Sequence, residues 1–381
     1  MKTYEAVIIG GGVSGMACGK TLHEEGIDFI LLTKEIGGRM LTSKSHAVNY
    51  GASYITSDYE HIIQTMGGGE AIKTSDCYFH HGDCPISFYR WRTLLELPKL
   101  VRLYFIASDF RKRLKRLRKQ ALYRQQKDIL ADDPVLRNYV NMPAGKFVSE
   151  NKLEYLNDMY FGPLFNSTAF IEYELGNAFD YLNNLMALFC KTYVADHSRC
   201  CRLLPKGWRD KIAICEVDAL YKNNHGGYSV ETANEVYQTK NIVLALPYKN
   251  AIEIYKVPEP KHNIPIYVLE VSGERNECCK NKQVVFFQPK SNDITILWKQ
   301  VTGTDVIFSK VPEPELEKYY LSHKIINSIY WETAVVLSGA KWSKQILDEG
   351  LYLASDYNIC GLEDAYITGV YAANQIIKGL S

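Results

Sequence analysis

Three glycines near the start of the chain, Gly10, Gly12 and Gly15, stand in the order G-x-G-x-x-G. They follow a β-rich run at residues 5–9 and open a segment, residues 14–25, that can form a helix. The first glycine of such a motif permits a tight turn, the second lets the backbone approach a pyrophosphate, and the third lets the helix pack against the strand. The N–H groups at the start of the helix then favour phosphate. The motif predicts a nucleotide site; the alternative is a glycine-rich turn that binds nothing.

The position that usually binds the ribose is irregular in this chain. Twenty-one residues after Gly12, where an Asp or Glu normally accepts the ribose hydroxyls, stands Thr33, followed by Lys34 and Glu35. Thr33 could bond one hydroxyl and Glu35 could turn inward, whereas a strand end facing solvent would equally explain Lys34. No second glycine motif of this kind follows a strand, so we expect no separate NAD(P)-binding domain.

The elements around the motif predict an α/β fold. Residues 5–9, 14–25 and 27–32 give the pattern strand, helix, strand, and such a unit implies a parallel sheet. Residues 91–130 and 147–192 have the apolar spacing of helices. The middle of the chain is therefore expected to be mainly helical.

The second half of the chain is richer in strands. Short strands are predicted within residues 213–246, with a hairpin turn around Asn223 and Gly227, and again within residues 264–308. A closing helix is expected from about residue 362 to residue 377. Because these regions alternate along the chain, we expect two domains whose segments interleave.

The composition is that of a globular protein. Of 381 residues, 46% are hydrophobic and 23% are charged, which argues against collagen-like, disordered and disulfide-scaffold classes. The formal charge, 44 − 43 = +1, predicts no overall attraction to nucleic acid. The ten cysteines include no CxxC pair, so we expect reduced, mostly buried thiols rather than a zinc cage. Adjacent histidines do not easily bind one ion, so His80 and His81 are not expected to form a metal site.

Membrane-spanning and secretory segments are not expected. No apolar run reaches the roughly 18–20 residues that a spanning helix requires. The hydrophobic stretch at the N-terminus is too short for a secretory signal and runs directly into glycines. We therefore expect a cytoplasmic protein.

Several motif blocks resemble one known superfamily. GGGVSGMACGKTLHEEGIDFILL, the triplet Gly37-Gly38-Arg39 and NYGASYIT at 49–56 resemble the N-terminus of the flavin-containing amine oxidase, phytoene desaturase and protoporphyrinogen oxidase superfamily. Further matches are LLPKGW at 203–208, NIVLALP at 241–247 and GLYLASDYNICGLEDAYITGVYAANQI at 350–376. The blocks cover about a third of the chain, and their order implies the interleaved fold over nearly all of it.

The resemblance implies a domain division and a cofactor. A Rossmann-like FAD-binding domain would comprise residues 1–75, 200–250 and 331–381, interleaved with an α+β substrate domain of residues 76–199 and 251–330 that contains a helical subdomain. No Cys or His stands in a recognisable flavin-attachment motif, so we expect non-covalent FAD. The candidate cofactor-binding residues are Gly10, Gly12, Val13, Ser14, Gly15, Thr33, Lys34, Gly38, Arg39, Met40, Val217, Asp356, Gly361 and Leu362.

The same resemblance implies individual roles. Arg39 would pair with the pyrophosphate, because a guanidinium fork suits phosphate oxygens. Asp356 would bond the ribityl or pyrophosphate end, or could simply be a turn residue, and Val217 would meet the adenine. The N-terminus of the last helix, around Leu362, would point N–H groups at the flavin N1–O2 edge and stabilise the charge that reduction puts there.

Features of the amine-oxidising members are absent. The lysine that these proteins place near flavin N5 is replaced by Ser272 and Gly273, and one wall of their aromatic cage by Gly361. Since an amine cation would need ring faces, the sequence argues against ordinary amine oxidation. Lys299 could be a displaced equivalent of the lysine, although a strand-end lysine is more often solvated.

Positive charge is concentrated in one predicted helix. Residues 90–127 contain thirteen Lys and Arg against two acidic residues, a net charge of +11. From residue 99 to 127, after a break at Pro98, apolar residues recur every three or four positions. The apolar positions include Phe110, Leu114, Leu117 and Ala121, and the basic ones Arg111, Lys112, Arg113, Lys115, Arg116, Arg118 and Lys119. Such a helix could lie on an anionic membrane; a solvated helix that covers the core or docks an acidic partner is the alternative, and nucleic acid is not expected.

These observations predict an FAD-dependent oxidoreductase. It would oxidise (desaturate) or isomerise a small apolar molecule, which a membrane could supply, by hydride transfer to flavin N5. Tyr54, Tyr160 and Tyr173 could line the substrate pocket, and no catalytic side chain is identified. The alternatives are an enzyme resembling amine or protoporphyrinogen oxidases, and a redox-inactive module that uses the same fold only for binding.

Overall fold

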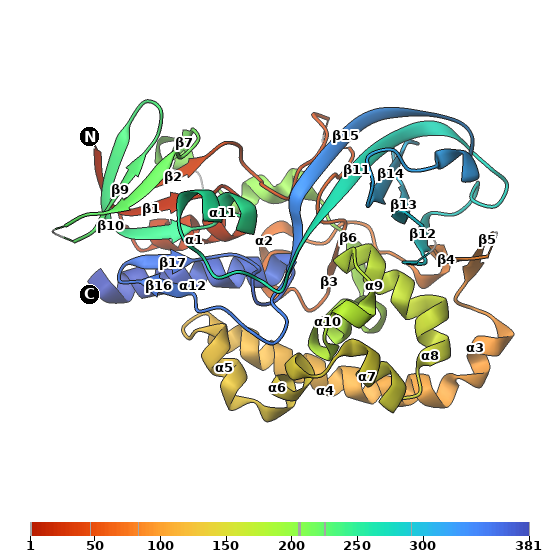
Figure 1. The fold of residues 1–381 in the computed structure, drawn as a ribbon. Coiled ribbons are helices and arrows are strands. Elements are labelled where there is room, and N and C mark those ends of the chain that lie inside the picture. Colours follow the sequence, from red (N-terminus) through yellow and green to blue (C-terminus); the bar gives the residue numbers. More distant parts are fainter. Residues whose placement is uncertain are drawn as a thin grey trace.

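A mostly parallel sheet of eight strands carries the start of the chain (Figure 1). The computed structural model describes residues 2–45, 47–82, 84–204, 207–224, 226–290 and 292–380. The strands are β1 (Lys2–Ile9), β2 (Phe29–Thr33), β7 (Ile212–Ile214), β8 (Ala219–Lys222), β9 (Tyr228–Glu231), β10 (Val236–Leu244), β16 (Ile346–Asp348) and β17 (Leu351–Leu353). Their order is β16-β17-β10-β1-β2-β7, and the β8–β9 hairpin joins at β10. β1 pairs in parallel with β2 and β10, which places the end of β1 at the middle of the sheet.

Two helices from opposite ends of the chain cover one face of this sheet. α1 (Val13–Glu24) and α12 (Leu362–Leu380) pack so closely that a Cβ on Gly369 would overlap the Ser14 carbonyl oxygen. Buried side chains such as Ile8, Cys18 and Ala372 form the shared core. The predicted α/β fold with a Rossmann-like unit is confirmed.

A second sheet of seven strands forms the roof of the other half of the molecule (Figure 1). Its strands, in spatial order, are β15 (Tyr320–Leu337), β11 (His262–Arg275), β14 (Asp305–Ser309), β13 (Ile294–Lys299), β12 (Val284–Phe287), β4 (Cys77–His81) and β5 (Cys84–Ser87). β15, β4 and β5 were not predicted from the sequence. The expected domain boundary at residues 330 and 331 falls within β15, which runs unbroken from this sheet towards the first one.

Helices pack beneath the second sheet, together with a short two-stranded sheet. These helices are α3 (Trp91–Leu95), α4 (Leu97–Ala121), α5 (Gln126–Asp132), α6 (Pro134–Asn141), α7 (Ala144–Glu150), α8 (Glu154–Leu156), α9 (Gly162–Ala169) and α10 (Ala178–Phe189). By contrast, α2 (Glu60–Met66) packs on α12, and α11 (Tyr248–Ile254) packs in the core of the first sheet. A π-helical turn (Asn157–Phe161) links α8 to α9. The small sheet pairs β3 (Tyr54–Thr56) with β6 (Thr192–Val194). α9 contacts β12 and β13, so this layer and the second sheet share one core.

The basic helix differs from its prediction in two ways. It begins at Leu97, with Pro98 in its first turn, and ends at Ala121, where the chain turns into α5 rather than continuing to residue 127. Its apolar stripe, including Phe110 and Leu114, is fully buried against the protein core. That stripe therefore cannot be a membrane-facing surface. Arg118, expected on the solvated side, is buried too.

Two further expectations concern cysteines and the membrane. Cys84 and Cys278 form a disulfide that ties β5 to the turn after β11, so the expectation of reduced thiols throughout is wrong. Buried Cys18 and Cys279 are among the free thiols, as expected.

Within the described ranges, no helix combines the length and apolar character needed to cross a bilayer. Pro205 and Lys206 of the LLPKGW block lie outside the described residues.

Candidate functional site

A cavity of about 630 Å³ runs from the glycine turn to the underside of the second sheet. Its lining begins with residues 9–14 at the end of β1 and reaches Phe286 and Trp298 on β12 and β13. Among the predicted cofactor-binding residues, all except Gly15 line it. A ligand in this cavity would therefore touch both halves of the molecule.

Each glycine of the turn is required for a different structural reason. Gly10 has a φ of +115°, a conformation that disfavours other residues. A Cβ on Gly15 would overlap the Gly10 carbonyl oxygen, so Gly15 permits the close packing of α1 on β1 rather than facing the cavity. Gly12 lines the cavity, and a Cβ at this position would meet no protein atom within 4 Å. Gly12 is thus the glycine that leaves space for a ligand.

The N-terminus of α1 opens onto this space. Its N-cap residue is Gly12, and no side chain caps the helix. The N–H groups of the first turn consequently lack the partner that a Ser, Thr, Asn or Asp cap would provide. Val13 and Ser14 both line the cavity. The arrangement suits a phosphate group, which would supply the missing acceptors.

The end of β2 lies beside the glycine turn, and its hydroxyl is already engaged. Thr33 Oγ1 accepts the Gly11 N–H at 3.0 Å and donates to the Glu35 carbonyl oxygen at 2.6 Å. Thr33 thus holds the turn together and has no hydrogen left for a ribose. Lys34 forms an exposed ion pair with Glu216, 2.5 Å apart. Glu35 is exposed on the cavity lining, where its carboxylate could turn towards a ribose.

Arg39 and Asp356 form an ion pair on the cavity wall. The Arg39 guanidinium donates to Asp356 Oδ1 at 2.5 Å and to the Ala334 carbonyl oxygen of β15 at 2.8 Å. Gly38 has a φ of +54° and lies against Gly12, which brings Arg39 close to the glycine turn. The two charged residues neutralise each other here, and a fork of N–H groups remains on the cavity wall.

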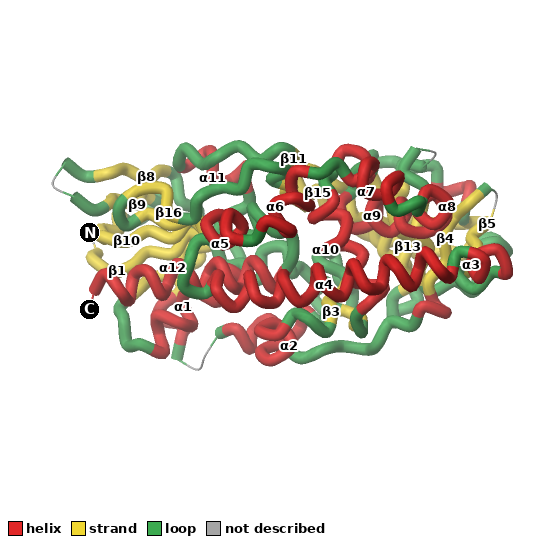
Figure 2. Tube along the Cα trace, turned by 90° about the horizontal axis from the view of Figure 1, so that it is seen from below, coloured by secondary structure: helices red, strands yellow, loops and turns green. Residues whose placement is uncertain are grey.

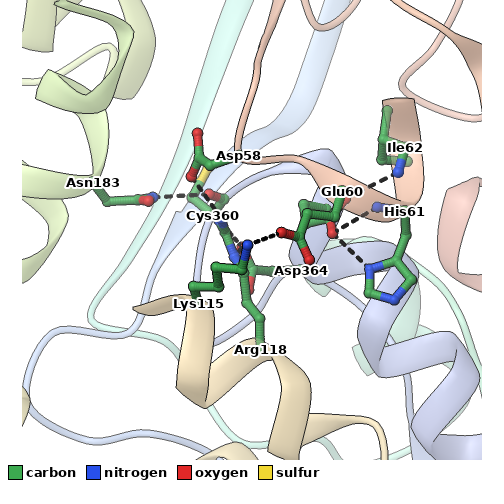
Figure 3. A network of polar contacts seen from close by, with 10 residues as sticks. Asp58, Glu60, His61, Ile62, Lys115, Arg118, Asn183, Cys360 and Asp364 are labelled. Carbon is green, nitrogen blue, oxygen red and sulfur yellow. Dashed lines mark hydrogen bonds and ion pairs between the residues drawn. The ribbon is translucent and has the colours of Figure 1, made fainter. Parts of the chain in front are cut away.

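The last helix, α12, begins on the cavity wall beside α10. Gly361 has a φ of +144°, and a Cβ there would lie 2.7 Å from Tyr59 Oη. Asn183 of α10 donates to the Cys360 carbonyl oxygen at 3.2 Å (Figure 3). Cys360, Gly361 and Leu362 all line the cavity. The start of α12 is therefore held in place by the helical layer.

A buried arginine provides the second link between these parts (Figure 3). Arg118 of α4 donates to Asp364 Oδ2 at 2.7 Å and to Asp58 Oδ2 at 2.9 Å, and all three side chains are almost fully buried. Burial opposes its charge, but the two carboxylates raise the pKa of Arg118 well above its ordinary value. Its guanidinium also lies 5.3 Å above the Tyr59 ring, which lines the cavity. Arg118 thus connects the helical layer to the cavity wall.

Glu363, next to Asp364, turns towards α2. Its carboxylate accepts the backbone N–H groups of His61 and Ile62, each at 3.0 Å, and lies 2.7 Å from His61 Nδ1. The hydrogen bond with Glu363 raises the pKa of His61 above its ordinary value near 6.5, although burial opposes this. The acidic side chains of the first turn of α12 are therefore paired away from the cavity.

The His61 contact predicts a pH-dependent stability. A histidine whose folded-state pKa is raised stabilises the fold fully below its unfolded pKa, and this stabilisation is lost as pH rises through the folded pKa. His61→Gln keeps the backbone N–H bonds but cannot become charged. We expect the melting temperature of the wild type to exceed that of His61→Gln by more at about pH 5.5 than at about pH 8.5. An equal difference at both pH values, measured by differential scanning fluorimetry, would contradict this role.

The far end of the cavity is apolar. Its wall combines side chains from the second sheet with others around α9: Phe79, Leu164, Phe170, Ile266, Val284, Phe286, Ile296, Trp298, Phe308 and Trp331. The acidic lining residues, Glu35, Glu216, Asp218, Glu253 and Asp356, belong to segments around the glycine turn, β7, α11 and the start of α12. The lining also includes one exposed cation that precedes β4, Lys73. The apolar side chains of this end suit the apolar part of a molecule.

Several expectations about this end need correction. Neither Ser272, Gly273 nor Lys299 lines the cavity; Ile266 is the β11 residue that does, and Lys299 is exposed. Of the three tyrosines, only Tyr54 lines it. Tyr160 packs between Phe79 and Phe88, and Tyr173 contacts Tyr181, both outside the lining.

One polar pair beside the apolar wall was missed by sequence reasoning. Tyr50 lines the cavity and donates to Glu270 Oε2 at 2.5 Å, and Glu270, on β11, is buried and also accepts from Thr304. Burial and the bond to Glu270 raise the pKa of Tyr50. Nothing in the sequence linked residues so far apart, although Tyr50 lies within the NYGASYIT block.

Among the described residues, no group of three or more His, Cys, Asp and Glu side chains could hold a metal.

Known proteins resemble the chain in sequence at its start. A family model described as an NAD(P)-binding Rossmann-like domain matches residues 8–67. Amine oxidase [flavin-containing] B from Bos taurus is 38% identical over 65 residues, which is 16% of this chain, and the human protein is 35% identical over 65 residues. In each match the chain spans 12% of the length of that relative.

Solved structures resemble the whole chain. A CLA-producing fatty acid isomerase from P. acnes superimposes with a TM-score of 0.70 at 11% identity, covering 99% of both chains. The chain has the fold of the flavin amine oxidase superfamily. A redesigned putrescine oxidase (TM-score 0.66, 14% identity, 99% of both chains) and a putative protoporphyrinogen oxidase from Exiguobacterium (0.62, 14%, 100% of this chain and 98% of that chain) share it. The amine oxidase fold thus extends over proteins whose names describe different reactions.

Proposed function

We propose that the protein is an FAD-dependent oxidoreductase that acts on an apolar substrate. The observation that carries the proposal is a single cavity with a dinucleotide-type glycine turn at one end and a largely aromatic and aliphatic wall at the other. The likeness to proteins with the amine oxidase fold supports the choice of FAD among dinucleotides. The uncapped start of α1 and the vacant Cβ position of Gly12 fit its pyrophosphate.

The remaining contacts with FAD follow from the cavity lining. Arg39 would bind the pyrophosphate through its guanidinium, with Asp356 orienting it, while Met40 packs nearby. Glu35 rather than Thr33 would accept from the adenosine ribose, because a carboxylate is the stronger acceptor and the Thr33 oxygen already accepts the Gly11 N–H. Val217 would contact the adenine, and Gly361 and Leu362 would present the start of α12 to the flavin ring. No cysteine attachment is proposed, so the FAD would be held non-covalently.

The proposed reaction needs few side chains that take part in bond making or breaking. When bound, FAD accepts a hydride at its N5 position. The chain would orient the substrate C–H bond against the flavin and exclude water through the apolar wall. Tyr50, with its hydroxyl donated to Glu270, would fix a polar edge beside this wall. No described residue needs to act as a nucleophile.

The substrate class follows from what the apolar end lacks. Its wall has no carboxylate to pair an amine cation, and the β11 residue at the cavity is Ile266. The burial of a charged amine there would be costly. We therefore favour desaturation or double-bond isomerisation of an apolar molecule. The fatty acid isomerase, which shares the fold, gives a precedent for the second reaction. An amine or porphyrinogen substrate remains the alternative.

Anaerobic reduction of the bound flavin tests this proposal. We expect the absorbance near 450 nm to bleach, or an isomerised product to form, with a polyene or an unsaturated fatty acid and not with putrescine or benzylamine. Gly12→Val, which should lack the cofactor, serves as the control for reactions outside the site. Bleaching by the amines alone would overturn the choice of substrate, and no reaction with any class would favour a redox-inactive module.

A further inference from the structure

An apolar surface lies exposed at one end of the helical layer. We call it the α3–α4 patch and define it by the exposed large hydrophobic residues between Tyr89 and Phe105: Tyr89, Trp91, Leu94, Leu95, Leu97, Val101, Tyr104 and Phe105. Trp91 is 78% exposed and Phe105 is 66% exposed. Figure 2 shows α4 along one long side of the molecule with α3 at its end. Exposed apolar groups gathered on two consecutive helices indicate an interaction surface.

The first half of α4 has two apolar faces. Leu103, Ala107 and Phe110 are buried in the core, whereas Leu97, Val101 and Phe105 point to solvent. A helix that is apolar on both sides normally has a second apolar environment to bury it. The protein core buries only one of these faces of α4. The exposed apolar face therefore indicates a second surface against which it packs.

The exposed face changes from apolar to basic along the helix. Continuing from Val101 and Phe105 at helical spacing, the same face carries Lys112, Arg116 and Lys119, all exposed. The acidic residue between them, Asp109, is paired with Arg113 at 2.7 Å. Around the apolar end, Arg90, Arg92 and Arg102 are exposed as well, while the acidic Glu96 is paired with Lys99 at 2.6 Å. An apolar, aromatic-rich end followed by a row of cations complements a bilayer surface with anionic headgroups.

The patch also adjoins the wall of the cavity. Thr93, the buried residue of α3, hydrogen-bonds to Tyr160 Oη at 2.6 Å. The Tyr160 ring packs on Phe79 at 5.1 Å between centroids, and Phe79 lines the cavity. Only one layer of aromatic side chains thus separates α3 from the apolar end of the site.

We propose that the α3–α4 patch docks the protein on an anionic membrane surface. The aromatic and aliphatic side chains of α3 and the start of α4 insert among the lipids, and the basic face of α4 lies over the headgroups. This docking does not depend on the proposed function; only its purpose, the supply of an apolar substrate to the cavity, rests on that function.

Vesicle binding by the full chain tests the proposal. We expect the protein to float with phosphatidylcholine vesicles that contain phosphatidylserine in about one lipid in three, and to bind pure phosphatidylcholine at least about tenfold more weakly. The double variant Trp91→Ser, Phe105→Ser should lose at least about tenfold in partitioning. Lys112→Glu with Arg116→Glu should lose a similar factor, because each cation near an anionic surface strengthens binding by about fivefold.

The matched control replaces exposed apolar residues elsewhere. Leu321, on β15, is 68% exposed, and Val301, in the turn between β13 and β14, is 88% exposed. The double variant Leu321→Ser, Val301→Ser should leave partitioning into the vesicles unchanged. The proposal is overturned if the wild type floats with neither vesicle, or if the control loses as much as the patch variant. It is also overturned if gel filtration shows a dimer that the patch variant dissociates, since the patch would then pair two copies. A flavin spectrum recorded on each sample separates these outcomes from a failure of the proposed function.

Discussion

Replacing Gly12 by valine is expected to abolish FAD binding while the fold is retained. The Gly12 backbone is extended, with φ −78° and ψ −173°, which valine adopts without strain. The new side chain would meet no protein atom at its Cβ and would instead occupy the space next to the start of α1. We expect a loss of at least about 100-fold in affinity, measured by titrating apoprotein with FAD.

A second glycine provides the control for this substitution. Gly145, on α7, has no atom nearer to its Cβ position than Glu174 Cγ at 3.9 Å and does not line the cavity. Gly145→Val should therefore bind FAD like the wild type. If Gly12→Val retained a wild-type flavin content at an unchanged melting temperature, the glycine turn would not be the phosphate site.

Replacing Arg118 by methionine is expected to destabilise the fold by about 3–5 kcal/mol, because it leaves two buried carboxylates without a counter-charge. Asp58 and Asp364 are both almost fully buried, and Arg118 is their shared cationic partner. Restoring neutrality in the triple variant R118M/D58N/D364N should recover most of the loss. Urea unfolding of the single and triple variants, followed by tryptophan fluorescence, measures both effects.

The neighbouring Arg116 gives the comparison for this prediction. It lies on the same helix but is exposed, so Arg116→Met should change the free energy of unfolding by only about 0.5 kcal/mol. Equal stabilities of Arg118→Met and Arg116→Met would show that the buried cluster does not hold α4 to α12.

The local sequence pattern was sufficient to predict the first strand, turn and helix of the fold. Strand, glycine turn and helix at residues 2–24 follow from the β-rich run, the special glycines and the helical spacing after them, all of which act within a few residues. The closing helix, predicted from about residue 362, begins at Leu362, directly after Gly361 with its positive φ. Residues that the resemblance assigned to the cofactor, such as Arg39 and Val217, do line the cavity, while their roles stay a prediction.

Long-range packing accounts for what the sequence did not predict. β4 pairs in parallel with β12, a partner more than 200 residues away, and such a pairing has no local signal. The amphipathic pattern of α4 indicated an apolar stripe but could not distinguish the protein core from a lipid surface. Arg118 looks like its basic neighbours in the sequence, yet it lies one residue from Leu117 on the buried face. Cys84, on β5, and Cys278, in the turn between β11 and β12, meet only because β12 pairs with β4, the neighbour of β5.

The identity and stoichiometry of the cofactor released from the purified wild-type protein test the central claim most directly. We expect absorbance bands near 370 and 450 nm, roughly as for other bound flavins, and one intact FAD per chain released by heat without cleavage of a covalent bond. A chain that carries no flavin, and that takes up none when incubated with excess FAD, would contradict the account.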